Sequence, residues 1–372
     1  MKHLPITALL LAAGLTAAAQ AQNPLLLQPR DHTRILEQSY ELDPGAAAAL
    51  ANRYGNLYVN TVPDGPLRVR LTITSRGTDS LKTLAKLEQI VLAETYENGR
   101  VRIEPGAGQQ LGGMELLQGM SIQMDVEAPA GHPLALSLIR GDLHLDTRTE
   151  PVDIDLKHGS LFGNSLLAEG NSIRAVNAVC SFDSITSARL DLRESEWTLR
   201  AAGTLDLKAE SSRTDLASVQ TLRTDTRVGD LHVGRVQEIR GSYDATKMLI
   251  DQIGQRCVLS GRLAPAMEIG SLSPGFDTLA ITSFAAPVRI QTPEETVFEL
   301  DARVERAELT AEGYYTLLAP KQAEDKRAVR RYHIQPETDG ARMAAPAGVI
   351  RIDSRMGAVK IKKTAQTGLT ER

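Results

Sequence analysis

Aromatic residues are scarce in this sequence. Phe, Trp and Tyr make up 4% of its 372 residues, with Trp197 as the single tryptophan, whereas 42% of the residues are hydrophobic. The core must therefore be built mainly from aliphatic side chains. The length allows one large domain or two modest ones.

Cysteine is scarcer still. Cys180 and Cys257 are the two in the chain, and no Cys-x-x-Cys or His-x-x-x-His pairing accompanies them, which argues against a zinc site. We favour two buried thiols that pack as small hydrophobic residues. A disulfide between them is the alternative, which an oxidising compartment would permit.

Positive charge is not in excess. The 42 basic and 46 acidic residues give a formal net charge of −4, and both signs are interspersed. A nucleic-acid partner or an anionic membrane surface requires clustered positive charge, so neither is expected.

A hydrophobic run occurs at the start of the chain. Lys2 precedes an apolar stretch from Ile6 to Leu15, and small residues follow up to Ala21. This plan predicts a cleaved signal peptide over residues 1–21, with Gln22 as the new N-terminus. A membrane anchor is the alternative, but the run is shorter than the roughly 20 residues that a span needs. No span is expected later, so we predict an exported protein of the periplasm or cell surface.

One phrase recurs along the chain, as ANRYGNLYV (51–59), SLIRGDLHL (137–145) and RIDSRMGAVKI (351–361). Aligning similar segments on their apolar residues gives spacings of roughly 15 to 21 residues, the length of one coil of a β-solenoid. The aligned residues are Leu136, Ile154, Ile173, Leu190, Leu205, Leu222, Ile239, Val258 and Leu279. Apolar and polar residues alternate within each segment, which predicts strands. A sandwich of antiparallel hairpins is the alternative, but two-residue hairpin turns are scarce.

Equivalent residues of successive coils should form ladders. The internal ladder is expected to contain Leu190, Leu205, Leu222 and Ile239. The outer ladder is expected to contain Asp155, Arg174, Asp191, Asp206, Arg223 and Arg240. The glycine of each phrase is expected at a tight corner.

Residues 78–94 depart from this pattern, because Leu81, Leu84, Leu87, Ile90 and Val91 fall on one helical face behind Thr78 or Asp79 as N-cap. We favour a helix there that packs against its own domain and covers the open end of the solenoid. A helix that binds a partner is the alternative. The predicted organisation is then completed by a linker over 22–39, the start of the solenoid over 40–130, repeated coils over 131–361 and a disordered tail over 362–372.

Catalytic chemistry on such a scaffold would use paired carboxylates with nearby bases. The candidates are Asp142, Asp146, Asp153 and Asp155, with Lys157 and His158 beside them. The favoured interpretation is an ordinary solvated strand face. His144 and His232 lie in the matched contexts GDLHL and GDLHV and should face outward, as a consequence of the repeat. We therefore predict no catalytic, cofactor-binding or metal-binding residues and no cofactor.

The chain resembles the putative-adhesin family of exported bacterial proteins of the Bacteroidota type, which is related to the head-domain auto-transporter adhesins. The likeness rests on NRYGNLYV, the following VRLTI, VEAPAGHPLALSLIRGDLHL, the repeated segments and SPGFDTLAITS, and it covers most of residues 40–361. It implies a right-handed β-solenoid in the cell envelope with no established enzymatic activity. The repeat, the signal peptide and the missing catalytic constellation predict a non-catalytic, adhesin-like protein that binds a glycan, an envelope component or a protein. The alternative function is a polysaccharide lyase or hydrolase on a β-helix scaffold.

Overall fold

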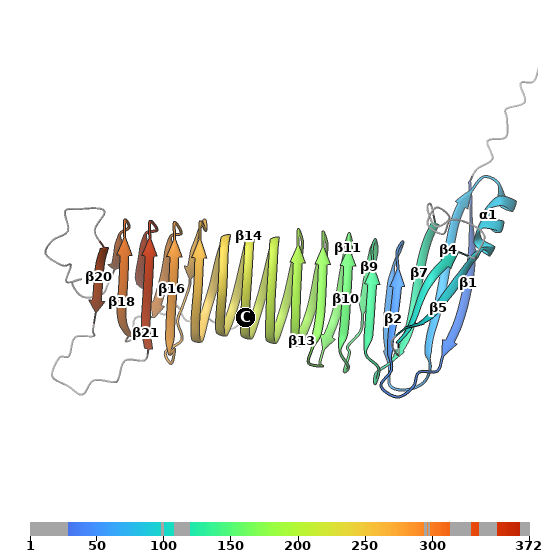
Figure 1. Ribbon diagram of the computed structural model, residues 1–372, viewed down its shortest axis with the longest axis horizontal. Helices are drawn as coiled ribbons and strands as arrows, with labels where there is room; N and C mark the ends of the chain where they lie inside the picture. Colours follow the sequence, from blue (N-terminus) through green and yellow to red (C-terminus); the bar gives the residue numbers. More distant parts are fainter. Residues whose placement is uncertain are drawn as a thin grey trace, which may run out of the picture.

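The computed structural model describes residues 29–97, 100–107, 120–293, 296, 298–312, 329–334 and 348–364. Within these residues the chain forms 22 strands and one short helix, so the all-β prediction with a single N-terminal helix is confirmed. The predicted signal peptide and residues 365–372 of the predicted tail lie outside the described residues, whereas residues 362–364, also predicted as disordered tail, form the end of a strand. Figure 1 shows a long row of strands, with a splayed group of strands and the helix at its N-terminal end.

Most of the chain is built from rungs, each made of two short strands that we call leg A and leg B. Each leg pairs in parallel with the same leg of the neighbouring rungs. Leg A strands include β2 (Ala47–Asn52), β8 (Leu134–Leu138), β10 (Val152–Lys157) and β12 (Asn171–Val176). Leg B strands include β3 (Leu57–Val62), β9 (Gly141–Leu145) and β11 (Gly159–Leu166).

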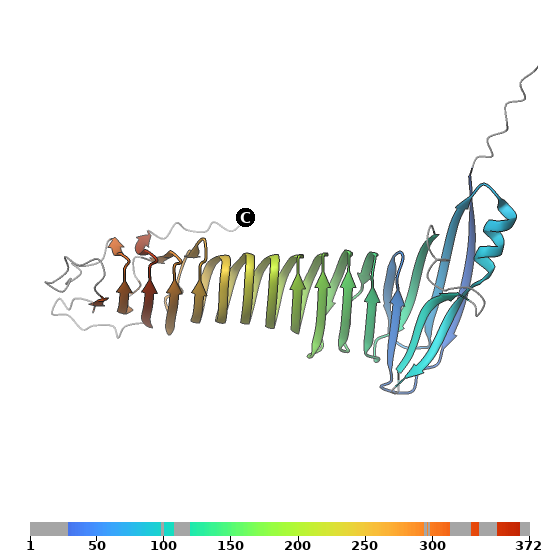
Figure 2. The ribbon, with the colours of Figure 1, turned by 45° about the horizontal axis from the view of Figure 1, so that its top comes forward.

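The rungs continue without a break in the two longest strands, β13 (Val179–Arg193) and β14 (Glu196–Arg262). The first half of β13 pairs with β11 and the second half with β12, so one strand supplies leg B of one rung and leg A of the next. In Figure 2 this region appears as a regular row of equivalent ribbons.

The C-terminal rungs are not stacked in chain order. In spatial order, leg A continues through β16 (Thr278–Phe284), β21 (Gly348–Arg355) and β18 (Phe298–Glu305). Leg B continues through β15 (Met267–Ile269), β17 (Val288–Pro293), β22 (Val359–Thr364) and β19 (Leu309–Glu312). The last described rung, β21 with β22, therefore lies between two rungs that precede it in the sequence. β20 (Val329–Ile334) pairs antiparallel with β18.

The N-terminal end is built mainly from antiparallel strands. β4 (Leu67–Gly77) pairs with both β1 (Arg30–Tyr40) and β7 (Met120–Pro129), and β5 (Ile90–Glu97) pairs with β6 (Arg100–Ala107). Residues 30–39, predicted as part of a linker, are thus strand. Their alternation is weak because β1 lies at an edge and most of its side chains are exposed or half-buried.

The predicted helix is shorter than expected. α1 spans Ser80–Glu88, with the side chain of Asp79 accepting the backbone N–H of Lys82 as N-cap, and the chain re-enters a strand at Ile90. Leu87 is buried, whereas Leu81 is 81% exposed. The apolar residues from Ile90 onward therefore continue the core as strand β5, and the helical periodicity over 78–94 overestimated the helix.

The pairing register corrects both predicted ladders. Arg189 pairs with Asp206, and Leu190 pairs with Leu207, so successive rungs here are 17 residues apart. Leu190 was predicted opposite Leu205, two residues out of register. Cys257, and not the exposed Val258, pairs with Leu279. A shift of two residues leaves every buried position of a strand buried, so alternation alone does not reveal it.

From the rung of β10 and β11 onward, the corner between leg A and leg B is marked by a non-glycine residue with positive φ, whereas the two earlier corners contain Gly55 and Gly141. Among the described residues, ten non-glycine residues have φ between 46° and 59°, and they are His158, Asn177, Glu194, Ser211, Val228, Ala245, Leu263, Ala285, Arg306 and Met356. The corner N–H often donates to the next rung, as from His158 to the carbonyl of Val176 over 3.0 Å. Glycine is needed where rungs approach most closely: a Cβ on Gly141 would clash with the carbonyl oxygen of Gly55.

The core runs between the legs along the whole stack and is largely aliphatic, as predicted. Cys180 and Cys257 are both buried free thiols, which confirms the favoured interpretation. Burial raises the pKa of the Cys180 thiol to about 12. Two of the few aromatic residues pack together in this core, because Phe182 stacks on Trp197. Gly163 has no side chain and so leaves room for the Phe182 ring.

Candidate functional site: a groove along leg A

The outer face of leg A carries an elongated groove of about 1020 Å³. It runs over β10, β12, the second half of β13, β14 and β16, from Asp153 at one end to Ala280 and Thr282 at the other. The inward side chains of these strands, such as Ile173 and Leu190, are buried, so the floor is backbone and the walls are outward side chains. Neighbouring parallel strands are about 4.8 Å apart, so the groove is roughly 30 Å long.

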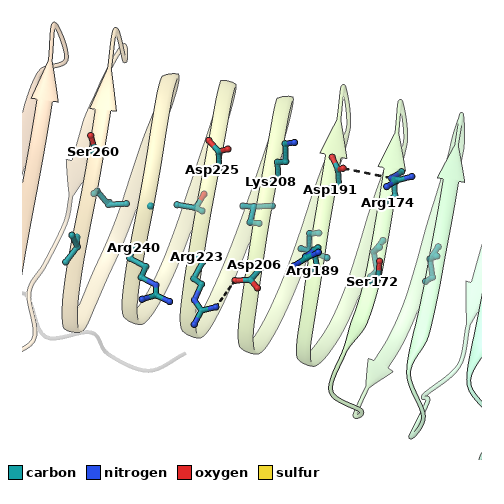
Figure 3. Close-up of a pocket in the computed structure, with 18 of the residues that line it drawn as sticks. Ser172, Arg174, Arg189, Asp191, Asp206, Lys208, Arg223, Asp225, Arg240 and Ser260 are labelled. Carbon is teal, nitrogen blue, oxygen red and sulfur yellow. Dashed lines mark ion pairs between the residues drawn. The ribbon is translucent and has the colours of Figure 1, made fainter.

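Two rows of side chains form the walls, and Figure 3 shows them along the stack. The first row contains Asp153, Ser172, Arg189, Asp206, Arg223 and Arg240. The second row lies two residues further along each strand and contains Asp155, Arg174, Asp191, Lys208 and Asp225. The predicted outer ladder had joined the beginning of the second row to the end of the first.

Most carboxylates of the groove already have partners. Asp191 lies 4.0 Å from Arg174, Asp206 lies 3.6 Å from Arg223, and Asp155 lies 3.8 Å from Lys157. The Ser242 hydroxyl donates to Asp225 over 3.0 Å.

Three cations of the groove, Arg189, Lys208 and Arg240, are exposed and make no ion pair with any described residue. Two carboxylates of the groove, Asp153 at the β10 end and Asp225 on β14, are likewise without an ion pair within the described ranges. The stretch of the groove from Arg189 to Arg240 therefore carries three unpaired cations and one carboxylate without an ion pair, Asp225.

The catalytic candidates are divided between the two legs. Asp153 and Asp155 line the groove, while Lys157 lies beside it and His158 occupies a corner, hydrogen-bonded to Asn177. Asp142 lies on leg B, and Asp146 directly follows that strand and accepts a hydrogen bond from the Asn164 amide over 3.2 Å. The structure therefore does not bring the six candidates into one site.

Both histidines of the matched contexts lie on the outer face of leg B, as predicted. His144 is stacked between Tyr58 and Phe162, with ring centroids 4.7 and 5.1 Å away. His232 lies between Asp215 and Asp251, at 3.3 and 3.1 Å. The aromatic stack was not predicted from the sequence, although Tyr58 and His144 occupy matched positions of the recurring phrase.

Neither a metal site nor a membrane helix emerges in the part of the chain that the structure describes. There, no three His, Cys, Asp or Glu side chains are grouped so as to hold a metal ion. No helix among these residues has the length and apolar character of a membrane span.

No known family model and no curated protein matches the chain. Solved structures with some likeness include a putative adhesin from Parabacteroides distasonis, with 9% identity, 90% of this chain and 97% of that chain covered, and a TM-score of 0.34. A putative adhesin from Parabacteroides merdae has 6% identity, coverage of 89% and 96%, and a TM-score of 0.32. A putative cell adhesion protein from Clostridium sporogenes has 8% identity, coverage of 91% and 100%, and a TM-score of 0.19. With TM-scores below 0.5, these likenesses decide neither the fold nor the function of this chain.

Proposed function

We propose that this protein is an exported, non-catalytic, adhesin-like binding protein of the cell envelope, and that its leg A groove binds an extended acidic glycan. The rungs form a right-handed β-solenoid, the hand that parallel strand crossovers almost always take. Residues 1–21 direct export to the periplasm or cell surface and are then removed. On this proposal, protein recovered from the envelope begins at Gln22.

The observation that carries the proposal is the set of three unpaired cations on the two walls of a long groove. Arg189 and Arg240 lie in the first row and Lys208 in the second, all on parallel strands of the groove. An extended polymer with repeated carboxylate or sulfate groups could contact all three, and its sugar hydroxyls could reach the polar groups between them. Guanidinium groups suit such anions because their N–H donors match the paired oxygens.

The test is binding of the mature protein to matched acidic and neutral polysaccharides by calorimetry at low and high salt. The groove variant replaces Arg189, Lys208 and Arg240 by Gln. Its matched control replaces Arg140, Arg213 and Lys247 by Gln, because these exposed cations lie outside the groove. We expect an acidic glycan to bind wild type and control alike, at least tenfold more weakly to the groove variant, and more weakly at high salt. Equal binding to both variants would refute the groove as the site.

The same samples test the enzymatic alternative. Asp153 and Asp155 both line the groove, so a lyase or hydrolase using paired carboxylates would lose activity in an Asp153→Ala, Asp155→Ala double variant. We expect no release of product from the polysaccharides by the wild type, with or without calcium. Product that appears with the wild type and vanishes with the double variant would replace the non-catalytic proposal by the enzymatic one.

A further inference from the structure

The aromatic stack on leg B ends abruptly. Tyr58, His144 and Phe162 occupy the same position of three successive rungs and stack ring on ring. The next two rungs carry Ser181 and then Thr198 at this position. Their side chains are too short to continue the stack, and Phe162 is 45% exposed. One face of the Phe162 ring covers His144, and the other opens over Ser181.

The space over Ser181 and Thr198 has defined sides. On one side lie Val179, which is half exposed, and its in-register neighbour Glu196. On the other side lies Asp183, whose carboxylate is 3.4 Å from the guanidinium of Arg200. We call this space, bounded by Phe162, Val179, Glu196, Asp183 and Arg200, the leg B seat.

We infer that the leg B seat binds a neutral pyranose, as a second saccharide site distinct from the groove. Rungs are about 4.8 Å apart, which lies within the 4.5–7 Å at which ring faces stack. A ring lying over Ser181 therefore occupies the next position of the stack and contacts the open face of Phe162.

The chemistry of the seat selects a sugar over an aromatic side chain. A pyranose has an apolar C–H face for Phe162 and a rim of hydroxyl groups for the carboxylates and the guanidinium. Asp183 is paired with Arg200, whereas Glu196 has no ion pair within the described ranges. The seat thus carries a net negative charge, which disfavours the acidic sugars proposed for the groove and favours an uncharged one.

The inference is tested by titrating the mature protein with a panel of neutral hexose oligosaccharides, followed by saturation-transfer NMR and calorimetry. Phe162→Ala removes the stacking face. Ser181→Tyr fills the seat by extending the aromatic stack without touching the core. Phe284→Ala is the matched control, because Phe284 is exposed to a similar degree, 40%, on leg A.

We expect one neutral oligosaccharide to bind wild type and Phe284→Ala equally, and at least tenfold more weakly to Phe162→Ala and to Ser181→Tyr. The groove variant lacking Arg189, Lys208 and Arg240 should keep this binding in full, so the two sites can fail separately. The inference is overturned if no neutral saccharide binds, or if both seat variants bind as the wild type does. It is also overturned if Phe162→Ala instead abolishes self-association in sedimentation experiments, because the occupant would then be a second copy of the chain.

Discussion

Arg148 is fully buried, and its hydrogen bonds go to neutral acceptors. Its guanidinium donates to the carbonyls of Ala128, Pro129 and His132 over 3.2, 2.9 and 2.7 Å, and to the Thr61 hydroxyl over 3.2 Å. Burial lowers the pKa of Arg148, and the negative charge of Glu150 opposes that shift. These bonds join the end of antiparallel strand β7 to the first rungs. The sequence carries no signal for this role, because Thr147-Arg148-Thr149 looks like any polar turn.

We predict that Arg148→Met destabilises the protein by at least about 3 kcal/mol, because it removes the side-chain donor from two buried carbonyls and one partly buried carbonyl. Arg148→Lys should recover part of this loss, since an ammonium group has three donors but lacks the planar geometry. Arg213→Met is the control, because Arg213 is exposed, and it should change stability by less than about 0.5 kcal/mol. Urea unfolding measures all three, and equal stability of Arg148→Met and Arg213→Met would contradict the role of Arg148.

At the scale of elements, the recurring unit is a leg, a corner and a second leg. The alternation of apolar and polar residues predicted the legs correctly, because burial of one face imposes a period of two. It did not predict which residues of adjacent rungs pair, since Leu205 and Leu207 are both buried and either could face Leu190. The corners also escaped prediction, because residues as different as His158, Glu194 and Val228 occupy them. Stacking between rungs therefore overrides the local preference for glycine.

Val228 is the least suited of these corner residues. It is a β-branched residue at φ 53°, a backbone conformation that is unfavourable for such residues. Its side chain is 56% exposed, so packing of that side chain does little to offset the backbone strain. Val228→Asn should stabilise the protein by about 1 kcal/mol, because asparagine tolerates the left-handed conformation far better.

The control for this substitution is Val258→Asn, at another exposed valine that lies within a regular strand. There asparagine should be neutral or destabilising, because it is unfavourable in strands. Thermal unfolding of both variants measures the difference. Stabilisation at position 258 and not at 228 would contradict the account of the corners.

At the scale of the whole molecule, rung order and chain order differ at the C-terminal end. β21 lies between β16 and β18. The sequence could not indicate this order, because β18 and β21 carry the same apolar pattern. A buried polar pair distinguishes them. The hydroxyls of Ser283 and Ser354 are 3.0 Å apart, and Ser354 also donates to the carbonyl of Gly357 over 2.7 Å. With β18 in its place, Val304 would face Ser283 and leave that hydroxyl without its partner, which is costly inside a core.

The surfaces of the molecule follow from the same register. The sequence predicted outward charged residues and outward histidines, but the groove and the leg B seat exist because particular residues share a row. A register wrong by two residues mixes the two walls of the groove, as the predicted outer ladder did. The pairing of Arg189 with Asp206 is thus the structural claim on which the proposed groove depends.

Disulfide cross-linking tests that claim most directly. In-register neighbours on parallel strands have α-carbons about 4.8 Å apart, within the 4.4–6.8 Å that a disulfide spans. Neighbours two residues out of register are about 8 Å apart, which is too far. Under mild oxidation, the variant with Arg189→Cys and Asp206→Cys should form an intramolecular disulfide, and the variant with Asp191→Cys and Asp206→Cys should not. The native thiols are buried and should not interfere. Cross-linking of the second variant and not of the first would contradict the register, and with it both walls of the groove.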